Sequence, residues 1–327
     1  MVTIRDVAKI ANVSVGTVSR YLNGTLKIRE DTAARIDEAI RKTNFSPNKN
    51  AASIKTKSSM TVALVIPSMK NITFAEIGES IHDVLAEKDY SLVTYTTSDL
   101  LDLEKDACKR IRENRADGAI FITEPYGNKD MSHIDLLEKS NIKTVMINRY
   151  YKENGYTNIS TDFHTGVKET IRHLNDRGYK RIGLILGWPD QDQSVVYING
   201  YREALAEFGV DYDDQLVKYC YYKEDLTQGA MMDLLNAGCD AVLTISDRAA
   251  LIALDLLEEQ GIAVPGDVAL VSSGNTEFSK LIKMTSLDIR GSKLGEHAAR
   301  TLLAKIEGES YANYLTLEPG IVVRQTT

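Results

Sequence analysis

The sequence predicts a small all-α head followed by an α/β body made of two doubly wound parallel-sheet lobes. Three observations lead to this prediction. The first 46 residues contain three short helical patterns, with a tight turn between the first two. From residue 61 onward, short apolar runs alternate with helical patterns, which is typical of βαβ units. Charge also divides the 327-residue chain, since residues 1–57 carry 11 Lys and Arg against 5 Asp and Glu, whereas the net charge of the whole is −7.

The head opens with a helix-start signal, T-x-x-D, in which Thr3 and Asp6 can satisfy the free amides of a first helical turn. Ser14 is a good N-cap for a second short helix over residues 15–23. A third helix is expected over residues 31–43, where apolar residues recur at helical spacing. Three short helices with a tight turn between the first two form a helix-turn-helix unit.

In such a unit, the second helix enters the major groove of DNA and its first residues face the base edges. Arg20 is suited to bind guanine through two hydrogen bonds, and Val15 to contact a thymine methyl group. The positive balance of this segment favours a polyanionic partner. The alternative interpretation is a small helical bundle that binds protein and has a solvated basic face.

Two strings in this part of the chain, TIRDVAKIANVSVGTVSRYLNG and NFSPNKNAASIKTK, closely resemble the head and hinge of the lactose/galactose repressor family of bacterial transcription regulators. The resemblance implies a hinge helix at residues 47–57 that orders on operator DNA and inserts a leucine into the minor groove. Ile54 stands at that position. The residues that we expect to contact DNA are Thr3, Arg5, Ser14, Val15, Gly16, Thr17, Arg20, Asn23, Lys27, Asn48, Lys49, Ile54 and Lys55.

The body contains two series of strand and helix patterns. In the first series, we expect strands at residues 61–66, 91–96, 118–123 and 144–148 and helices at 74–87, 103–113 and about 133–139. In the second series, we expect strands at residues 181–186, 216–222, 241–246 and 268–273 and helices at 164–177, 195–208, near 227–235 and 248–260. Runs such as TVALVI are apolar throughout, which indicates strands buried on both faces of a parallel sheet.

This alternation resembles the periplasmic-binding-protein-like sensor domain of the same family, in which the chain crosses between two lobes several times. The resemblance implies a helix-turn-helix head at residues 1–46, a hinge helix and linker at 47–59, and an effector-binding and dimerisation domain at 60–327. Lobe 1 is expected at about 60–160 and 290–319, and lobe 2 at about 161–289 and 320–327.

The resemblance implies candidate effector contacts at the family's cleft positions, which lie near the carboxyl ends of the strands, where ligands of such folds bind. Glu124 ends one strand, and Gln191 shares with Trp188 a loop that should overhang the cleft. Trp188 is equally well interpreted as a surface aromatic that packs on Pro189. The residues that we expect to contact the effector are Phe74, Thr123, Asn148, Arg149, Asp162, Trp188, Gln193, Tyr197, Tyr222, Ser246, Asp247 and Asn275.

Three positions depart from the pattern of the sugar-binding members. Where those members carry Arg, Asn and Asp, this chain has Tyr197, Ser246 and Gly274. Each lost charged or amide contact removes about 1–3 kcal/mol, so we do not expect the effector to be recognised as a free disaccharide would be. One hypothesis is a phosphorylated sugar bound by Arg149. The alternative is that these positions belong to the core or the rim.

Other classes of function find no support in the sequence. No G-x-G-x-x-G follows a strand, and neither a P-loop nor a G-x-S-x-G elbow is present, so we expect no enzyme and no cofactor. Cys108, Cys220 and Cys239 match no zinc signature, so we expect no metal site. A transport protein is disfavoured, because the N-terminus lacks the apolar block of a signal peptide; this also predicts a cytoplasmic location and no membrane partner.

We therefore expect a transcription regulator, a repressor in carbohydrate metabolism, that binds a pseudo-palindromic operator as a homodimer. A sugar or sugar phosphate in the cleft would be its effector. An alternative trigger is a phosphocarrier protein acting as corepressor, because residues 292–303 resemble the docking helix of the catabolite-control branch of the family. Arg300 fits an arginine of that surface, whereas Ser292 and Lys293 replace a Tyr-Asp pair.

Overall fold

The chain forms two compact units, the head at Met1–Ser59 and the body at Met60–Thr327. They are seen in a computed structural model of the whole chain. The structure describes residues 2–22, 28–45, 58–125, 127, 130–149 and 155–327. None of the helices in these ranges is both long enough and apolar enough to cross a membrane.

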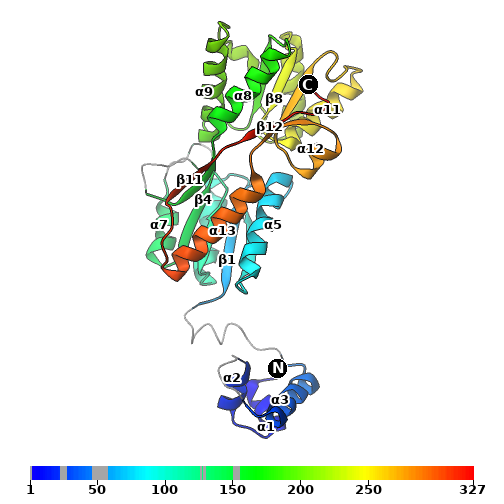
Figure 1. Cartoon of the computed structure of the whole chain (residues 1–327). Coiled ribbons are helices and arrows are strands. Elements are labelled where there is room, and N and C mark those ends of the chain that lie inside the picture. The colour runs from blue at the N-terminus through cyan, green and yellow to red at the C-terminus, as the bar shows by residue number, and fades with distance from the viewer. Residues whose placement is uncertain (1, 23–27, 46–57, 126, 128–129, 150–154) are drawn as a thin grey trace. The chain divides into compact units, whose positions relative to one another are not determined.

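The described part of the head contains helices α1 (Ile4–Ala11), α2 (Val15–Leu22) and α3 (Glu30–Thr43) (Figure 1). Both predicted helix starts are confirmed. The Asp6 carboxylate accepts hydrogen bonds from the amide and the hydroxyl of Thr3 at 2.8 and 2.7 Å, and Ser14 Oγ accepts one from the Thr17 amide at 3.1 Å. The three helices pack around a small apolar core of Val7, Ala8, Ala11, Val18, Ile36 and Ala39.

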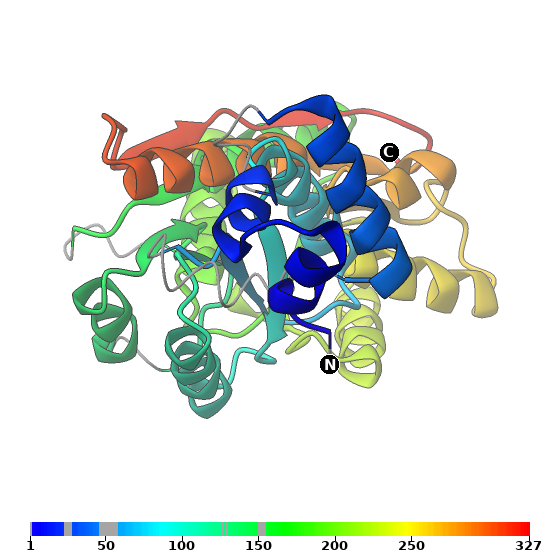
Figure 2. The ribbon, with the colours of Figure 1, turned by 90° about the horizontal axis from the view of Figure 1, so that it is seen from below.

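The first lobe of the body contains a parallel sheet with the strand order β11-β5-β4-β3-β1-β2. Its strands are β1 (Thr61–Ile66), β2 (Ser91–Thr96), β3 (Gly118–Phe121), β4 (Lys143–Ile147), β5 (Asn158–Thr161) and β11 (Tyr314–Leu317). Its helices are α5 (Ile72–Ala86), α6 (Leu101–Glu113), α7 (Ser132–Lys139) and α13 (Gly291–Glu307). Helices α5 and α13 lie side by side, as the view from below also shows (Figure 2).

Strand β1 illustrates why this lobe needs apolar strands. Successive side chains of a strand point to opposite faces of the sheet. Val62, Leu64 and Ile66 belong to the core beneath α5 and α13, whereas Ala63 and Val65 belong to the core beneath α6 and α7. All five side chains are buried. The run TVALVI therefore shows no alternation of polar and apolar residues, because helices cover both faces.

The second lobe repeats this plan with the strand order β12-β10-β9-β8-β6-β7, in which only β12 is antiparallel to its neighbour among the described pairs. Its strands are β6 (Ile182–Leu186), β7 (Val217–Tyr219), β8 (Ala241–Thr244), β9 (Ala269–Gly274), β10 (Thr285–Asp288) and β12 (Gly320–Val322). Its helices are α8 (Phe163–Asp176), α9 (Asp192–Glu207), α10 (Glu224–Asn236), α11 (Asp247–Glu259) and the short α12 (Glu277–Leu281). Helices α8 and α9 pack together on one side of the sheet, away from α11 (Figure 1).

The chain crosses between the lobes after β5, after β10 and after β11. Lobe 1 therefore receives α13 and β11 only after the chain has passed through most of lobe 2. The first two crossings are joined by a hydrogen bond of 2.7 Å from Thr161 Oγ1 to the Ile289 carbonyl. Loops that follow the parallel strands of both sheets meet at the junction and line a cleft.

The fold class predicted from the sequence is confirmed, and β1 and β2 span the predicted residues. The strand predicted at 216–222 is shorter, because Tyr221 and Tyr222 adopt left-handed backbone conformations with φ of 50° and 55° that end it. Sequence patterns did not indicate β5, β10, β11 and β12. These strands have three or four residues, and segments such as NIST and TSLD carry too few apolar residues to stand out.

Candidate functional site

The exposed face of α2 is the candidate DNA-binding surface of the head. Val18 is completely buried and anchors this helix in the core. The Tyr21 hydroxyl lies 2.9 Å from both carboxylate oxygens of Asp37 and fastens α2 to α3. This hydrogen bond also raises the pKa of Tyr21. The predicted contact residues of this helix are exposed or half-buried, as DNA recognition requires, namely Ser14, Val15, Gly16, Thr17 and Arg20.

Other predicted DNA contacts lie at the start of α1 or beyond the described segments. Thr3 and Arg5 are exposed. The hinge helix predicted at residues 47–57 falls outside the described residues, and so do six predicted contacts: Asn23, Lys27, Asn48, Lys49, Ile54 and Lys55.

The junction of the two lobes holds an inner cleft of about 60 Å³ that adjoins an outer cleft of about 620 Å³. The side chains that line both are Asn71, Phe74, Asp99, Tyr222 and Ser246, together with Pro67. Asp99 and Glu124 are the charged side chains that line the inner cleft within the described part of the chain. Most of the other lining groups are amides, hydroxyls and aromatic or aliphatic side chains, which is the lining of a site for a small polar ligand.

Five residues that we call the interlobe clasp join the lobes across the inner cleft: Asp99 and Glu124 of lobe 1, and Gln191, Asp192 and Tyr222 of lobe 2. Gln191 Nε2 donates to the Glu124 carbonyl at 3.0 Å and lies 3.4 Å from Asp99 Oδ2. The Asp192 amide donates to Glu124 Oε1 at 2.8 Å. The Tyr222 hydroxyl donates to Gln191 Oε1 at 3.3 Å. The clasp holds α9 of lobe 2 against two acids of lobe 1.

The pKa values of both acids of the clasp are raised. Burial raises the pKa of Asp99 to about 7, although hydrogen bonds from the Glu124 amide and from Gln191 oppose the change. Burial likewise raises the pKa of Glu124 to about 7, against the hydrogen bond from the Asp192 amide. The negative charge of Asp99 also raises the pKa of Glu124, and that of Glu104 raises the pKa of Asp99, because like charges disfavour joint ionisation.

Aromatic side chains form one wall of the outer cleft. The rings of Trp188 and Tyr221 meet edge to face with centroids 4.8 Å apart, and Phe74 and Tyr222 line the same space. Gly187 makes this arrangement possible, because a Cβ atom there would lie 2.5 Å from the Tyr222 hydroxyl oxygen. The edge-to-face contact shows that Trp188 packs on Tyr221 at the outer cleft.

The structure brings six of the twelve predicted effector contacts to the cleft. Phe74, Asn148, Gln193, Tyr222 and Ser246 line the inner cleft, and Trp188 lines the outer one. The remaining six are not part of either lining: Thr123, Arg149, Asp162, Tyr197, Asp247 and Asn275.

Arg149 lies in a buried network inside lobe 1, which corrects the expectation that it binds a phosphate in the cleft. Its guanidinium donates to both carboxylate oxygens of Glu104 at 3.1–3.2 Å, and neither side chain is exposed. His133 Nε2 lies 2.6 Å from Glu104 Oε1, and Thr123 Oγ1 donates to Oε2. Burial would raise the pKa of Glu104, but these hydrogen bonds and the Arg149 charge hold it below its usual value.

The Asp247 carboxylate is also bound by groups of the protein itself. Its Oδ2 accepts hydrogen bonds from the amide and the hydroxyl of Thr276 at 2.8 and 2.6 Å, and from Ser279 Oγ at 3.2 Å. A Cβ atom at Gly274 would lie 2.7 Å from the same oxygen, and the backbone φ there is +152°. In this structure the Asp247 carboxylate occupies the space that a side chain at position 274 would need.

The other three predicted contacts are engaged within lobe 2. Tyr197 is completely buried, with its hydroxyl 2.6 Å from Ser273 Oγ and its ring packed on Phe163. Asp162 caps α8 through the Thr165 amide at 3.1 Å. Asn275 Oδ1 accepts a hydrogen bond of 2.6 Å from Arg324.

Sequence reasoning missed Asp99, Asn71, Thr73 and Ser273 as lining residues. The available signal was positional, because Ser273 ends a predicted strand, Asp99 follows one closely, and Asn71 and Thr73 stand where the loop after another leads into α5. Asp99 stands in the polar stretch TTSDL, which is also typical of a turn.

Comparisons with known proteins agree with this architecture. Residues 3–48 match the model of the bacterial regulatory proteins of the lacI family, and residues 171–327 match that of the periplasmic binding protein-like domain. Catabolite control protein A of Staphylococcus xylosus is 28% identical over 284 residues, which are 86% of this chain and 85% of the relative. The transcriptional repressor PurR of Vibrio atlanticus is 24% identical over 331 residues, covering 100% and 98%.

Solved structures show the same fold. A complex of the transcriptional regulator CelR with cellobiose superimposes with a TM-score of 0.74 at 27% identity, covering all of both chains. The lac repressor dimer bound to operator and the anti-inducer ONPF superimposes with a TM-score of 0.84 at 22% identity, covering 99% of this chain and 98% of that one.

A helix-turn-helix head joined to a body of two doubly wound lobes defines a DNA-binding transcription regulator. The chain carries the helix-turn-helix domain of the lacI family of bacterial regulatory proteins, followed by a periplasmic binding protein-like domain. Members of this family bind DNA and are not enzymes.

Proposed function

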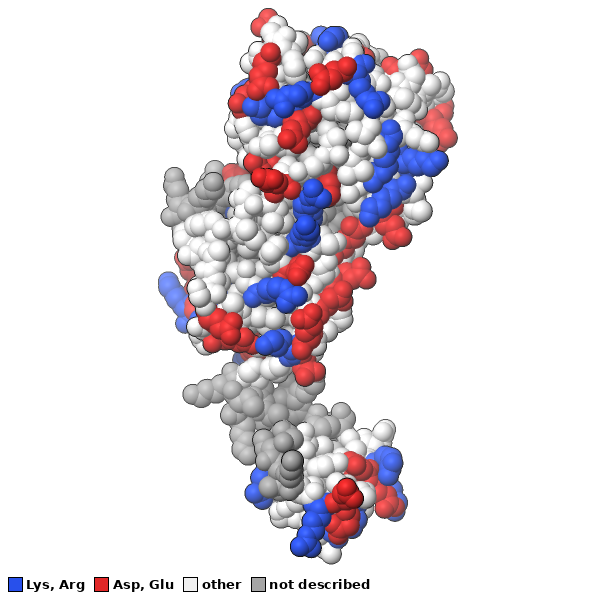
Figure 3. All heavy atoms as spheres, viewed as in Figure 1, with Lys and Arg blue, Asp and Glu red and all other residues white. Residues whose placement is uncertain are grey.

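We propose that this regulator is a sequence-specific repressor that binds a pseudo-palindromic operator as a homodimer and responds to a small molecule in the interlobe cleft. The observation that carries the proposal is the exposed face of α2 in a chain whose body has a polar cleft between its lobes. DNA contact is assigned to the head and hinge. On the body, basic and acidic side chains are interspersed over much of the face in Figure 3.

Replacing Arg20 with alanine is expected to weaken operator binding by about 1–3 kcal/mol, since Arg20 is proposed to contact a base edge. Lys42→Ala, which removes one positive charge from α3, is the matched control and should change affinity much less. The measurement is a gel shift with the DNA upstream of the chain's own gene, over a salt series. Equal losses in both variants, or a weak dependence of wild-type affinity on salt, would contradict the assignment.

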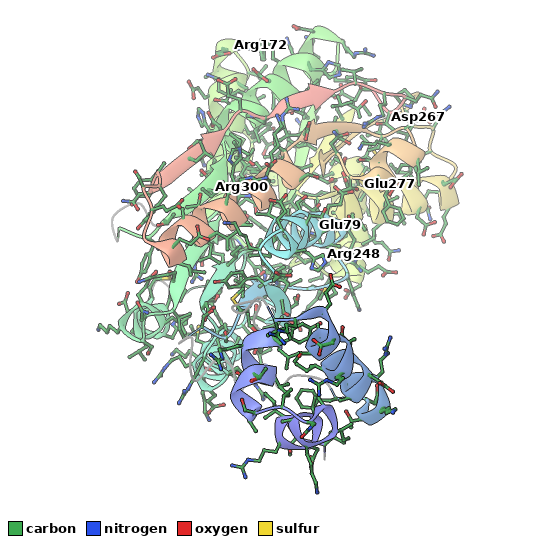
Figure 4. All side chains as sticks on the ribbon, turned by 60° about the horizontal axis from the view of Figure 1, so that its bottom comes forward. Glu79, Arg172, Arg248, Asp267, Glu277 and Arg300 are labelled. Carbon is green, nitrogen blue, oxygen red and sulfur yellow. The ribbon has the colours of Figure 1, made fainter. Side chains whose placement is uncertain are left out.

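The proposed dimer surface includes α12, which carries the exposed apolar side chains Phe278 and Leu281, 46% and 72% exposed. An apolar pair of this kind on a short helix is suited to pack against its symmetry copy. Helix α12 also approaches α5, because the Glu277 amide donates to Glu76 Oε1 at 2.9 Å, near the labelled Glu79 and Glu277 (Figure 4).

Leu281→Lys is expected to weaken the dimer by about 3 kcal/mol or more, because a twofold interface loses the same apolar contact twice. Leu136→Lys on α7 is the control, since Leu136 is likewise exposed, at 46%, but lies on α7 of lobe 1, outside the proposed surface. Sedimentation over a range of concentrations measures both. A Leu281→Lys protein that dimerises like the Leu136→Lys protein would remove α12 from the proposed interface.

The small-molecule site is proposed at the inner cleft and the aromatic wall beside it. One further observation supports a ligand there: Thr73 Oγ1 is buried at the lining and makes no hydrogen bond within the described part of the chain. A buried hydroxyl of this kind usually has a partner. The proposed contacts are the lining residues Phe74, Asn148, Trp188, Gln193, Tyr222 and Ser246.

The phosphocarrier alternative gains no support. On α13, Arg300 is engaged with Glu296 at 3.0 Å and with Glu87 at 3.7 Å. The small-molecule proposal is tested by thermal-shift screening against sugars and their derivatives, since a ligand that binds the folded state raises its apparent stability.

A further inference from the structure

The two lobes contribute unlike groups to the interlobe clasp. Lobe 1 contributes acceptors, namely the carboxylates of Asp99 and Glu124 and the Glu124 carbonyl. Lobe 2 contributes a donor, Gln191 Nε2, that lies 3.0 Å from this carbonyl and 3.4 Å from Asp99 Oδ2. The side-chain amide of Gln191 thus occupies a position beside Asp99 and Glu124 that favours a hydrogen-bond donor.

The charge of this position is unbalanced. Among the described residues, no lysine or arginine lines the inner cleft, whereas two carboxylates do. Arg149, the cation that weakly stabilises both carboxylates, is itself bound to Glu104 behind the lining. A neutral amide donor such as Gln191 leaves the two acids without a cationic partner in the inner cleft, and buried carboxylates favour one. The cations Lys70, Lys223 and Arg248 line the adjoining outer cleft.

We propose that the cleft selects a ligand that carries a protonated amine, and that this group replaces Gln191 Nε2 between Asp99 and Glu124. The inference rests on the proposed function, because it specifies the effector of the same cleft. Phe74 and Tyr222 line the cleft beside the acids, and aromatic rings also favour a cation. A phosphorylated ligand, by contrast, would bring like charge against two carboxylates.

The protonation of the acids sets the pH range of this selectivity. Because burial raises the pKa of both Asp99 and Glu124 to about 7, both acids are largely neutral in mildly acidic solution and ionised in mildly basic solution. Preference for an amine should therefore increase with pH. The charged and titratable groups that act on the two acids include Glu104, Arg149, Asp192 and Tyr222. The outer cleft, which Asp99 also lines, adds Lys70, Lys223, Glu224 and Arg248.

The experiment compares matched compounds that differ only in charge. One set is D-glucose, D-glucosamine and D-glucose 6-phosphate, and the second is glycerol, 3-amino-1,2-propanediol and glycerol 3-phosphate, which are small enough to enter most cavities. Binding to the full-length protein is followed by thermal shift and by the fluorescence of Trp188, the one tryptophan in the sequence. The variants are Asp99→Asn with Glu124→Gln, and the control Asp102→Asn with Glu169→Gln, whose acids are exposed.

At about pH 7.5, where the acids are mostly ionised and the amines still largely protonated, we expect the amine of at least one set to bind about tenfold or more tightly than its neutral partner, and the phosphate more weakly still. The preference should fall to less than about threefold near pH 5.5 and in the Asp99→Asn, Glu124→Gln protein, but not in the control. Equal or tighter binding of a neutral or phosphorylated member overturns the inference. So does the same preference in both double variants, or no binding by any of the six compounds.

A gel shift in the same preparations separates this inference from the proposed function. An amine preference without binding to DNA would leave the inference standing and overturn the repressor assignment. Specific DNA binding without the amine preference would overturn the inference and leave the repressor assignment standing.

Discussion

Arg149→Met is expected to lower the free energy of unfolding of the body by about 3–5 kcal/mol, because it leaves the Glu104 carboxylate buried without its cation. Glu104 and Arg149 are completely enclosed and joined by three hydrogen bonds of 3.1–3.2 Å. His133 and Thr123 also contact Glu104, but neither carries the permanent charge of a guanidinium group. Urea denaturation followed by circular dichroism measures the loss.

Arg172→Met is the control for this variant. Arg172, labelled in Figure 4, pairs with Glu207 at 2.9 Å on the surface of lobe 2, where both side chains are well exposed. Surface pairs of this kind contribute about 0–1 kcal/mol. Adding Glu104→Gln to Arg149→Met should restore part of the lost stability, since the orphaned charge is then removed. Comparable losses in the Arg149 and Arg172 variants would show that the buried pair is not holding lobe 1 together.

Glu124→Gln is expected to raise the stability of the body in basic solution and to leave it almost unchanged in acid. The pKa of Glu124 is raised from 4.5 to about 7 in the folded protein. The contribution of Glu124 to the free energy of unfolding is therefore fully present below the pKa of the unfolded chain. It is lost as the pH rises through the pKa of the folded protein. The difference in pKa corresponds to as much as about 3 kcal/mol, lost by the wild type between about pH 4.5 and 7.

Glutamine removes this loss because it cannot ionise, and its carbonyl oxygen can still accept the hydrogen bond from the Asp192 amide. Thermal unfolding at a series of pH values should show the variant gaining on the wild type as pH rises. The exposed Glu169→Gln is the control and should follow the wild type throughout. If the stability difference between Glu124→Gln and the wild type does not change with pH, Glu124 does not titrate in this range.

The sequence predicted the head better than the cleft, for a physical reason. Helix starts depend on contacts three residues apart, such as those of Thr3 with Asp6 and of Ser14 with Thr17, so a local pattern reports them. The apolar strands are equally visible, because burial on both faces excludes polar residues. Short edge strands such as β5 depend on their neighbours and left no local signal.

The partners of the cleft residues lie far apart in the sequence. Arg149 stands at the end of a strand, where a ligand contact is expected, but its carboxylate partner is 45 residues away on α6. Asp99 and Gln191 meet across 92 residues and across the lobe junction. The residue type and its place after a strand were predictable, whereas the choice between a ligand and an internal partner was set by tertiary packing.

The late return of the chain to lobe 1 has a consequence for biosynthesis. Helix α13 covers β3, β4 and β5 with apolar side chains that include Leu294, Ala298 and Leu302, and β11 completes the same sheet. Both are made only after most of lobe 2 has left the ribosome. Until then, an apolar face and the open edge of β5 remain exposed on the nascent chain, a state that is prone to aggregation and a substrate for chaperones. Truncation before residue 291 should therefore yield insoluble protein rather than a folded first lobe.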